Sequence, residues 1–241
     1  MLRLLLVLLW ILIFFIVLGI PFLLAVWLIG LFSPSLKNRL SQRFVVFVSG
    51  GITFLSGVKI IAHGLENIPA DEPVLYISNH RSFYDIFTAY RFFPGLTACV
   101  AKIEWKKVPL LRQWMDNLHC IFLNRKNSRE GLKAIVRAAE ELRGDHSIWI
   151  CPEGTRSHGD ALLPFHEGSF RAAFQSGRSI VPMTFTRTDD IFENHMPWVK
   201  AATVHLFFDK PVPAANLSRA EQKEVIEQVQ QKIQERYNEF R

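Results

Sequence analysis

Cysteine is scarce in this chain of 241 residues, which contains only Cys99, Cys120 and Cys151. The number is odd, no two of them form a CxxC pair, and each lies in a short apolar run. This pattern argues against a disulfide framework and predicts three buried thiols in a reducing compartment. The eight histidines are scattered, and no HExxH or CxxC spacing gathers metal ligands. The sequence therefore predicts no metal site.

Other signatures are missing as well. The sequence has no G-x-S-x-G motif, which argues against a serine hydrolase. Its formal net charge of +6 could indicate a nucleic-acid binder, but the basic residues beyond the N-terminus are dispersed among acidic ones without a basic and aromatic stripe. No internal repeat or low-complexity linker divides the chain. The remaining partners for a basic protein are anionic lipid and phosphorylated substrates.

Charge is absent from residues 4–36, a run long enough to cross a bilayer core, which needs roughly 20 apolar residues. A signal peptide would have a shorter apolar region and a small-residue cleavage site. Pro21 interrupts the run, so two arrangements are open: one kinked span, or a helical hairpin that enters one leaflet and returns. The second apolar stretch, residues 44–58, favours the hairpin. Residues 1–57 are therefore predicted to be a membrane anchor.

Basic residues flank this anchor unequally. Arg3 precedes it, whereas Lys37, Arg39 and Arg43 follow it. The excess of positive charge after the segment predicts that the rest of the chain lies on the cytoplasmic side of the cell membrane. The same residues can attract anionic headgroups.

Residues 58–241 alternate short apolar runs with longer polar segments. Helices are predicted at 128–143, which has one apolar face, and at 216–241, which opens with the capping-box pair Ser218 and Glu221. The predicted strands are 59–63, 74–78, 97–102, 120–123, 148–151, 180–185 and 203–208. This alternation predicts an α/β domain with a mixed, largely parallel sheet flanked by helices.

A polar loop follows the predicted strand 74–78 and carries His80 and Asp85. Ser82 is a good N-cap for a helix that starts at Phe83, which would place Asp85 at the third helical position. With His80 in the loop and Asp85 in the first turn, the two side chains can converge. An aspartate that accepts one imidazole N–H leaves the other ring nitrogen as a base. The alternative is that Asp85 only caps the helix and His80 is an ordinary loop residue.

A second polar turn follows the predicted strand 148–151. Gly154 allows the backbone to approach a ligand closely, and Arg156 offers a planar fork that matches a phosphate or carboxylate. Glu153 beside them is open to three roles: an ion-pair partner, a charge that orients the base, or a substrate contact. A plain surface turn is the alternative for the whole segment.

Five short motifs together resemble the glycerolipid acyltransferase family, in particular bacterial 1-acylglycerol-3-phosphate acyltransferases. In chain order they are residues 79–85 (N-H-x-S-x-x-D), 101–104 (A-K-x-E), 122–125 (F-x-x-R), 153–157 (E-G-T-R-S) and 180–183 (apolar residues with Pro). They span about residues 74–185 in the family order. The chain departs from the family at Asn124, where Asp is common, and at residues 165–168, which lack the usual lysine.

The resemblance implies a role for each matched residue. His80 is expected to act as general base on the acceptor hydroxyl, and Asp85 to orient it. The acceptor phosphate is expected to bind Arg125 and Arg156 with help from Lys102. The acceptor is also expected to contact the segment formed by Glu153, Gly154 and Thr155.

The implied reaction is acyl transfer from acyl-CoA or acyl carrier protein to the sn-2 hydroxyl of 1-acylglycerol 3-phosphate at the membrane, without a metal or redox cofactor. Two alternatives remain within the enzyme class: another lysophospholipid, or glycerol 3-phosphate, as acceptor. A non-catalytic lipid-binding protein is the alternative from outside it.

Overall fold

A computed structural model of the chain describes residues 1–124, 127–159 and 161–241. In these residues one mixed sheet has the strand order β1-β7-β6-β2-β5-β3-β4, and every neighbouring pair is parallel except β6 and β7. The strands are β1 (Lys59–His63), β2 (Leu75–Ser78), β3 (Thr97–Lys102), β4 (Ile121–Leu123), β5 (Ser147–Ile150), β6 (Ile180–Thr186) and β7 (Thr203–Phe208).

The predicted strands and sheet type are confirmed, with each strand boundary within about one residue of its predicted position. The central strands β2 and β6 are buried along their whole length. A parallel strand covered on both faces needs an apolar run rather than an alternating pattern, which is why these segments are so apolar.

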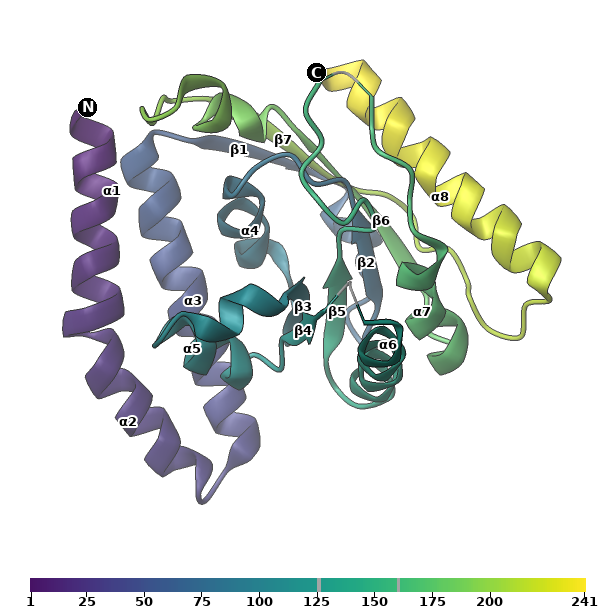
Figure 1. The fold of residues 1–241 in the computed structure, drawn as a ribbon, viewed down its shortest axis with the longest axis horizontal. Coiled ribbons are helices and arrows are strands. Elements are labelled where there is room, and N and C mark those ends of the chain that lie inside the picture. The colour runs from purple at the N-terminus through teal and green to yellow at the C-terminus, as the bar shows by residue number, and fades with distance from the viewer. Residues whose placement is uncertain (125–126, 160) are drawn as a thin grey trace.

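Helices cover both faces of the sheet (Figure 1). One face carries α6 (Ser128–Arg143), α7 (Arg171–Ser176) and α8 (Arg219–Phe240). Apolar residues of these helices, such as Leu142 and Ile233, form one core with strand residues such as Ile148. The helix predicted at 128–143 is confirmed, and the C-terminal helix begins with the predicted capping box of Ser218 and Glu221.

The other face carries α4 (Tyr84–Ala89), α5 (Leu111–Asn117) and the N-terminal helices (Figure 1). These are α1 (Leu2–Leu12), continued by a π-helical turn at Ile13–Val17, then α2 (Gly19–Gly30) and α3 (Pro34–Ser56), which runs back along the first two. Within the described residues no single helix is long and apolar enough to cross a membrane. The pair Leu2–Val17 and Gly19–Gly30, bent by 41°, passes that test only when taken together, by length and composition.

The N-terminal helices pack on the α/β domain through an apolar cluster. Val7 and Ile52 share a core with Tyr84 of α4 and with Val204 of β7. The ring of Trp114 in α5 stacks on Phe44 of α3 at 4.4 Å between centroids. The opposite sides of α1 and α2 expose apolar side chains, namely Leu5, Leu8, Leu9, Leu12, Leu24, Trp27 and Leu28, and Leu31 just after α2 is exposed as well.

Polar segments follow the carboxyl ends of the parallel strands β2, β3, β5 and β6. Parallel strands end at one edge of a sheet, which is where open α/β sheets bind their ligands. The predicted site residues that the structure describes belong to the segments at or just after the ends of β2, β3 and β5. None of the three cysteines forms a disulfide; Cys99 and Cys120 are buried as predicted, whereas Cys151, just after β5, is only half-buried.

Candidate active site

His80 and Asp85 meet just beyond the end of β2. The Nδ1–H of His80 donates to Oδ2 of Asp85 at 2.8 Å. The Asp85 side chain is 1% exposed, whereas that of His80 is 31% exposed. A carboxylate that accepts the Nδ1–H leaves the lone pair of Nε2 unprotonated on a ring that solutes can reach. The pair therefore has the arrangement of a general base and its orienting group.

Four donors surround the buried Asp85 carboxylate. Besides His80, the backbone N–H groups of Arg81 and Ser82 donate to Oδ2 at 2.8 and 3.0 Å. The Thr188 hydroxyl donates to Oδ1 at 2.6 Å. Hydrogen bonds to the charged form of an acid stabilise that form and offset the cost of burying it. The four hydrogen bonds thus fix the position of the Asp85 side chain.

The helix that carries Asp85 begins one residue later than predicted. α4 starts at Tyr84, so Asp85 is the second helical residue rather than the third. The Ser82 hydroxyl still accepts from the Tyr84 N–H at 2.9 Å, which is a capping contact, but it acts from one position further out. From this position Asp85 accepts the N–H groups of both Arg81 and Ser82.

Glu153 is buried beside the pair and holds the backbone of His80. Its carboxylate accepts the N–H of His80 and the N–H of Leu163, both at 2.8 Å. Burial raises the pKa of the Glu153 carboxyl above its ordinary value, while the two backbone donors act in the opposite direction. Both oxygens are engaged by backbone groups, so of the three roles left open by the sequence this geometry matches positioning of the base.

Two hydrogen bonds from Ser157 complete the link between the turn after β5 and the loop after β2. The N–H of Ser157 donates to the carbonyl of His80 at 2.8 Å, and its hydroxyl donates to the same oxygen at 3.2 Å. Gly154 has a φ of +75°, a left-handed conformation that favours glycine. Its N–H bonds the Cys151 carbonyl at 3.1 Å. Thr155 is exposed at the tip of the turn.

Arg156 lies against Phe83 and a carboxylate that the sequence analysis did not find. Its Nη1 donates to Oε1 of Glu193 at 2.7 Å, and its guanidinium lies 3.9 Å from the centre of the Phe83 ring. Glu193 also accepts the Ser82 hydroxyl at 2.6 Å and the Phe83 N–H at 2.8 Å. Arg156 therefore lies next to the loop of His80. A guanidinium has five N–H donors, so the ion pair with Glu193 does not use all of them.

Lys102 ends β3 and is exposed at the same edge of the sheet. Arg125, the other predicted phosphate ligand, lies outside the described residues. Its neighbour Asn124 follows β4 and lines a cavity described below. The structure thus brings His80, Asp85, Glu153, Gly154 and Arg156 into one group and places Lys102 at the same edge.

Thr188 and Glu193 were missed because they follow β6 in a polar stretch without any motif. A usable signal exists: β6 is parallel to β2, so residues after its end reach the same edge as His80. The same stretch supplies Asp189, whose carboxylate accepts from the buried Arg81 at 2.6 Å. This ion pair ties the loop after β6 to the loop of His80.

An apolar cavity of about 290 Å³ opens beside the turn after β5. It lies between the sheet and the helices α6 and α7, and Gly154 belongs to its wall. Most of the lining is aliphatic or small, including Val100, Leu123, Ala134, Ile135, Ala138, Ile150 and Ala172. The cavity is of the size and character of sites for apolar ligand groups.

A histidine–carboxylate pair at the carboxyl edge of a largely parallel sheet, beside an apolar cavity, defines a class: α/β proteins equipped to bind a lipid-like group and to accept a proton. The chain belongs to the acyltransferase family. The family model, described as Acyltransferase, matches residues 59–186, which are more than half of the 241 residues.

The similar proteins include 1-acyl-sn-glycerol-3-phosphate acyltransferases from several kingdoms. The protein of Borreliella burgdorferi is 29% identical over 180 residues, which are 75% of this chain and 72% of that protein. The alpha form of Homo sapiens is 31% identical over 144 residues, 58% of this chain and 50% of the human protein. The chain therefore spans about half the length of the mammalian relatives that it matches.

A solved structure has the same fold. The 1-acyl-sn-glycerophosphate acyltransferase of Thermotoga maritima superposes with a TM-score of 0.80 over 97% of this chain and 94% of that chain, at 23% identity. The coverage includes the N-terminal helices as well as the α/β domain.

Proposed function

We propose that the chain transfers a fatty-acyl group from a thioester to the sn-2 hydroxyl of 1-acylglycerol 3-phosphate, giving phosphatidate and a free thiol. The observation that carries the proposal is the 2.8 Å contact between His80 and a buried Asp85, in a member of the acyltransferase family. The names of the relatives indicate the acceptor.

His80 is the general base in this proposal. Its Nε2 removes the proton of the acceptor hydroxyl as the oxygen attacks the thioester carbonyl. The tetrahedral intermediate then collapses, the C–S bond breaks, and the imidazolium returns the proton to the departing thiolate. A positioned base contributes about 10²- to 10⁴-fold to such a step. The Asp85 carboxylate stabilises the positive charge that the ring carries between the two proton transfers.

The phosphate of the acceptor is assigned to the basic groups at the same edge. Lys102 is exposed at the end of β3, and Arg156 lies beside the loop of His80. Arg125 joins them as an expectation from the family motif. Gly154 and Thr155 form the turn over which the acceptor would lie, and Glu153 positions this turn against the catalytic loop. A bidentate guanidinium contact suits a phosphate because the geometries match.

The acyl chain of the donor is assigned to the cavity under α6. Gly154 contributes to the cavity wall and is two residues from Arg156, so a chain bound there would place its thioester near the base. The donor is acyl-CoA or acyl carrier protein, and the proposal involves no cofactor or metal in the chemical step and no nucleic acid.

The N-terminal helices are assigned to the bilayer, with the α/β domain on the cytoplasmic side of the cell membrane. The exposed apolar side chains of α1 and α2 support this assignment. Seating at the membrane would spare the enzyme the cost of moving lipid chains into water, about 0.8 kcal/mol per CH₂.

The test is an assay of the purified full chain in lipid vesicles. Labelled lysophosphatidate, lysophosphatidylcholine and glycerol 3-phosphate are each offered with acyl-CoA or acyl carrier protein. The proposal expects labelled phosphatidate from lysophosphatidate with at least one donor, at a higher kcat/KM than for the other acceptors. A preference for another acceptor would reassign the substrate. Binding of lysophosphatidate without transfer from either donor would indicate a non-catalytic lipid-binding protein.

A further inference from the structure

Three side chains that are far apart in the sequence meet at the edge of the sheet opposite His80. His119 precedes β4, His146 precedes β5, and Glu141 lies in the last turns of α6. His80 follows the carboxyl end of β2, whereas this group lies at the amino ends of strands parallel to it. The group therefore has no part in the proposed acyl transfer.

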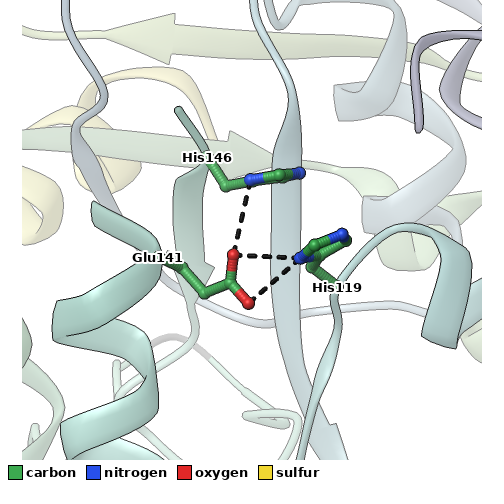
Figure 2. A group of neighbouring side chains, drawn as sticks. All are labelled: His119, Glu141 and His146. Atoms are coloured by element: carbon green, nitrogen blue, oxygen red, sulfur yellow. Dashed lines mark hydrogen bonds and ion pairs between the residues drawn. The ribbon is translucent and has the colours of Figure 1, made fainter. Parts of the chain in front are cut away.

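Both imidazole rings turn toward the Glu141 carboxylate (Figure 2). Oε2 of Glu141 lies 3.0 Å from Nδ1 of His119 and 3.4 Å from Nδ1 of His146. The two rings are stacked, with centroids 4.1 Å apart and planes 20° apart. One ligand atom from each residue thus falls within 4.8 Å of the others.

We propose that this cluster is a zinc site, with Nδ1 of His119, Nδ1 of His146 and Oε2 of Glu141 as protein ligands and water in the fourth position. Zinc binds nitrogen and oxygen at about 2.0–2.2 Å in a tetrahedron, whose edge is then about 3.4 Å. Two of the three separations, 3.0 and 3.4 Å, are close to that edge, and all three ligand atoms lie within 4.8 Å of one another. An ion can therefore enter with small side-chain shifts, and imidazole with carboxylate is a donor set that suits zinc.

Asn38 of α3 provides the outer contact that a zinc-bound histidine needs. Its Nδ2 lies 3.0 Å from Nε2 of His119. With zinc on Nδ1, Nε2 carries the proton, and a half-turn of the Asn38 amide offers the carbonyl oxygen as acceptor. Partners of this kind fix the ring of a metal-bound histidine. The ion would thereby brace the N-terminal helices against the α/β domain.

Two neighbouring charges are compatible with an ion. Oδ1 of Asp145 is 2.7 Å from Nδ1 of His146, too close for both atoms to be ligands of one tetrahedron, but this side chain is 72% exposed and can turn into solvent. Nε of Arg137 lies 3.8 Å from Oε1 of Glu141. Arg137 thus faces Oε1, which is not a proposed ligand and which also lies 3.1 Å from Nδ1 of His119, and Oε2 remains the proposed ligand atom.

The experiment measures Zn²⁺ binding to the full chain in detergent after treatment with a chelator. Equilibrium dialysis with elemental analysis gives the stoichiometry and Kd, and thermal unfolding gives the Tm with and without Zn²⁺. One zinc per chain and a Tm increase that the chelator reverses are expected. Glu141→Gln keeps the shape and an accepting oxygen but loses the charge, so its zinc affinity is expected to fall about tenfold or more.

The control is His205→Gln. His63 and His205 also contact each other, at 3.0 Å, but neither has a carboxylate in that contact, so this variant should bind zinc as the wild type does. Wild-type protein that binds no zinc above the level of Glu141→Gln would overturn the proposal and leave a hydrogen-bonded cluster only. If Glu141→Gln unfolds, the Co²⁺ spectrum of the wild type decides: intense tetrahedral bands support the site, and weak octahedral bands refute it.

Discussion

Replacement of Asp85 by Asn removes a single charge from the site and little else. Oδ2 accepts three N–H groups and Oδ1 accepts the Thr188 hydroxyl. The amide oxygen of Asn can occupy the Oδ2 position and keep all three N–H donors. The amide NH₂ then faces Thr188, whose hydroxyl can rotate and accept. Asp85→Asn therefore tests the charge of the carboxylate, apart from its position.

The size of the effect follows from the 2.8 Å contact with His80. Two unit charges at that distance attract by about 6 kcal/mol at an effective dielectric constant of 20 and by about 1.5 kcal/mol in water. The His80 side chain is 31% exposed, so the value lies between these limits. A loss of about 3 kcal/mol from the transition state, where the ring is positively charged, lowers kcat roughly 10²-fold.

The assay follows thiol release from acyl-CoA at saturating lysophosphatidate, with the Tm of each variant measured in parallel. Asp85→Ala is the contrasting variant. It leaves the buried donors without an acceptor, at about 1–3 kcal/mol each, and is expected to lose stability as well as activity. An Asp85→Asn protein that folds normally and keeps kcat within about threefold of wild type would refute a catalytic role for the charge.

Three further predictions use matched variants. Thr188→Val removes a hydrogen bond to the charged Asp85, so it should lose about 1.5–3 kcal/mol of stability and about tenfold in kcat. Thr188→Ser retains the hydroxyl and should restore both the stability and kcat. Equal losses in the two variants would contradict this positioning role of Thr188. Gly131 lines the cavity, and a Cβ there meets nothing within 4 Å. Gly131→Leu should therefore exclude about two methylenes of the donor's acyl chain and lower the ratio of kcat/KM for long donors to kcat/KM for short donors about tenfold. Gly131→Ala should leave this ratio unchanged. An unchanged ratio in Gly131→Leu would place the acyl chain of the donor outside this cavity. Arg156→Ala should reduce kcat/KM for lysophosphatidate at least about tenfold more than for a neutral lysolipid, with Arg156→Lys intermediate; equal effects on both acceptors would argue against a phosphate contact.

The sequence predicted the sheet well because its strands are short, apolar and bounded by polar turns. β2 and β6 are buried throughout, and the short length of their apolar runs, with polar residues on either side, separates them from helices. The order of the strands did not follow from the sequence. It places β7 between β1 and β6, antiparallel to β6, through contacts between residues far apart in the chain.

The site was predicted in part. His80 and Asp85 were found because the strand, the loop and the helix that carry them are contiguous in the sequence. A histidine in the loop and an aspartate in the first helical turn can converge, so their contact was predicted from the spacing. Thr188 and Glu193 come from a loop more than 100 residues away, and only the parallel pairing of β2 and β6 brings that loop to the pair. Glu153 was assigned to the acceptor by resemblance, whereas its backbone contacts became visible only in the folded chain.

The cluster of His119, Glu141 and His146 shows a similar limit. Neither histidine lies in a ligand-spaced motif, so no pattern in the sequence pairs them with Glu141. Their meeting depends on two strands starting at the same edge of the sheet.

The central claim is that His80 is the base that activates the acceptor hydroxyl, and the rate of acyl transfer to labelled lysophosphatidate in His80→Ala tests it most directly. Among the residues that the structure describes, the ring makes one side-chain hydrogen bond, with Asp85, and it is partly exposed, so the variant is expected to fold with a Tm close to that of wild type. The account predicts a loss of kcat of about 10²- to 10⁴-fold. Transfer at a rate near wild type by the folded variant would contradict it.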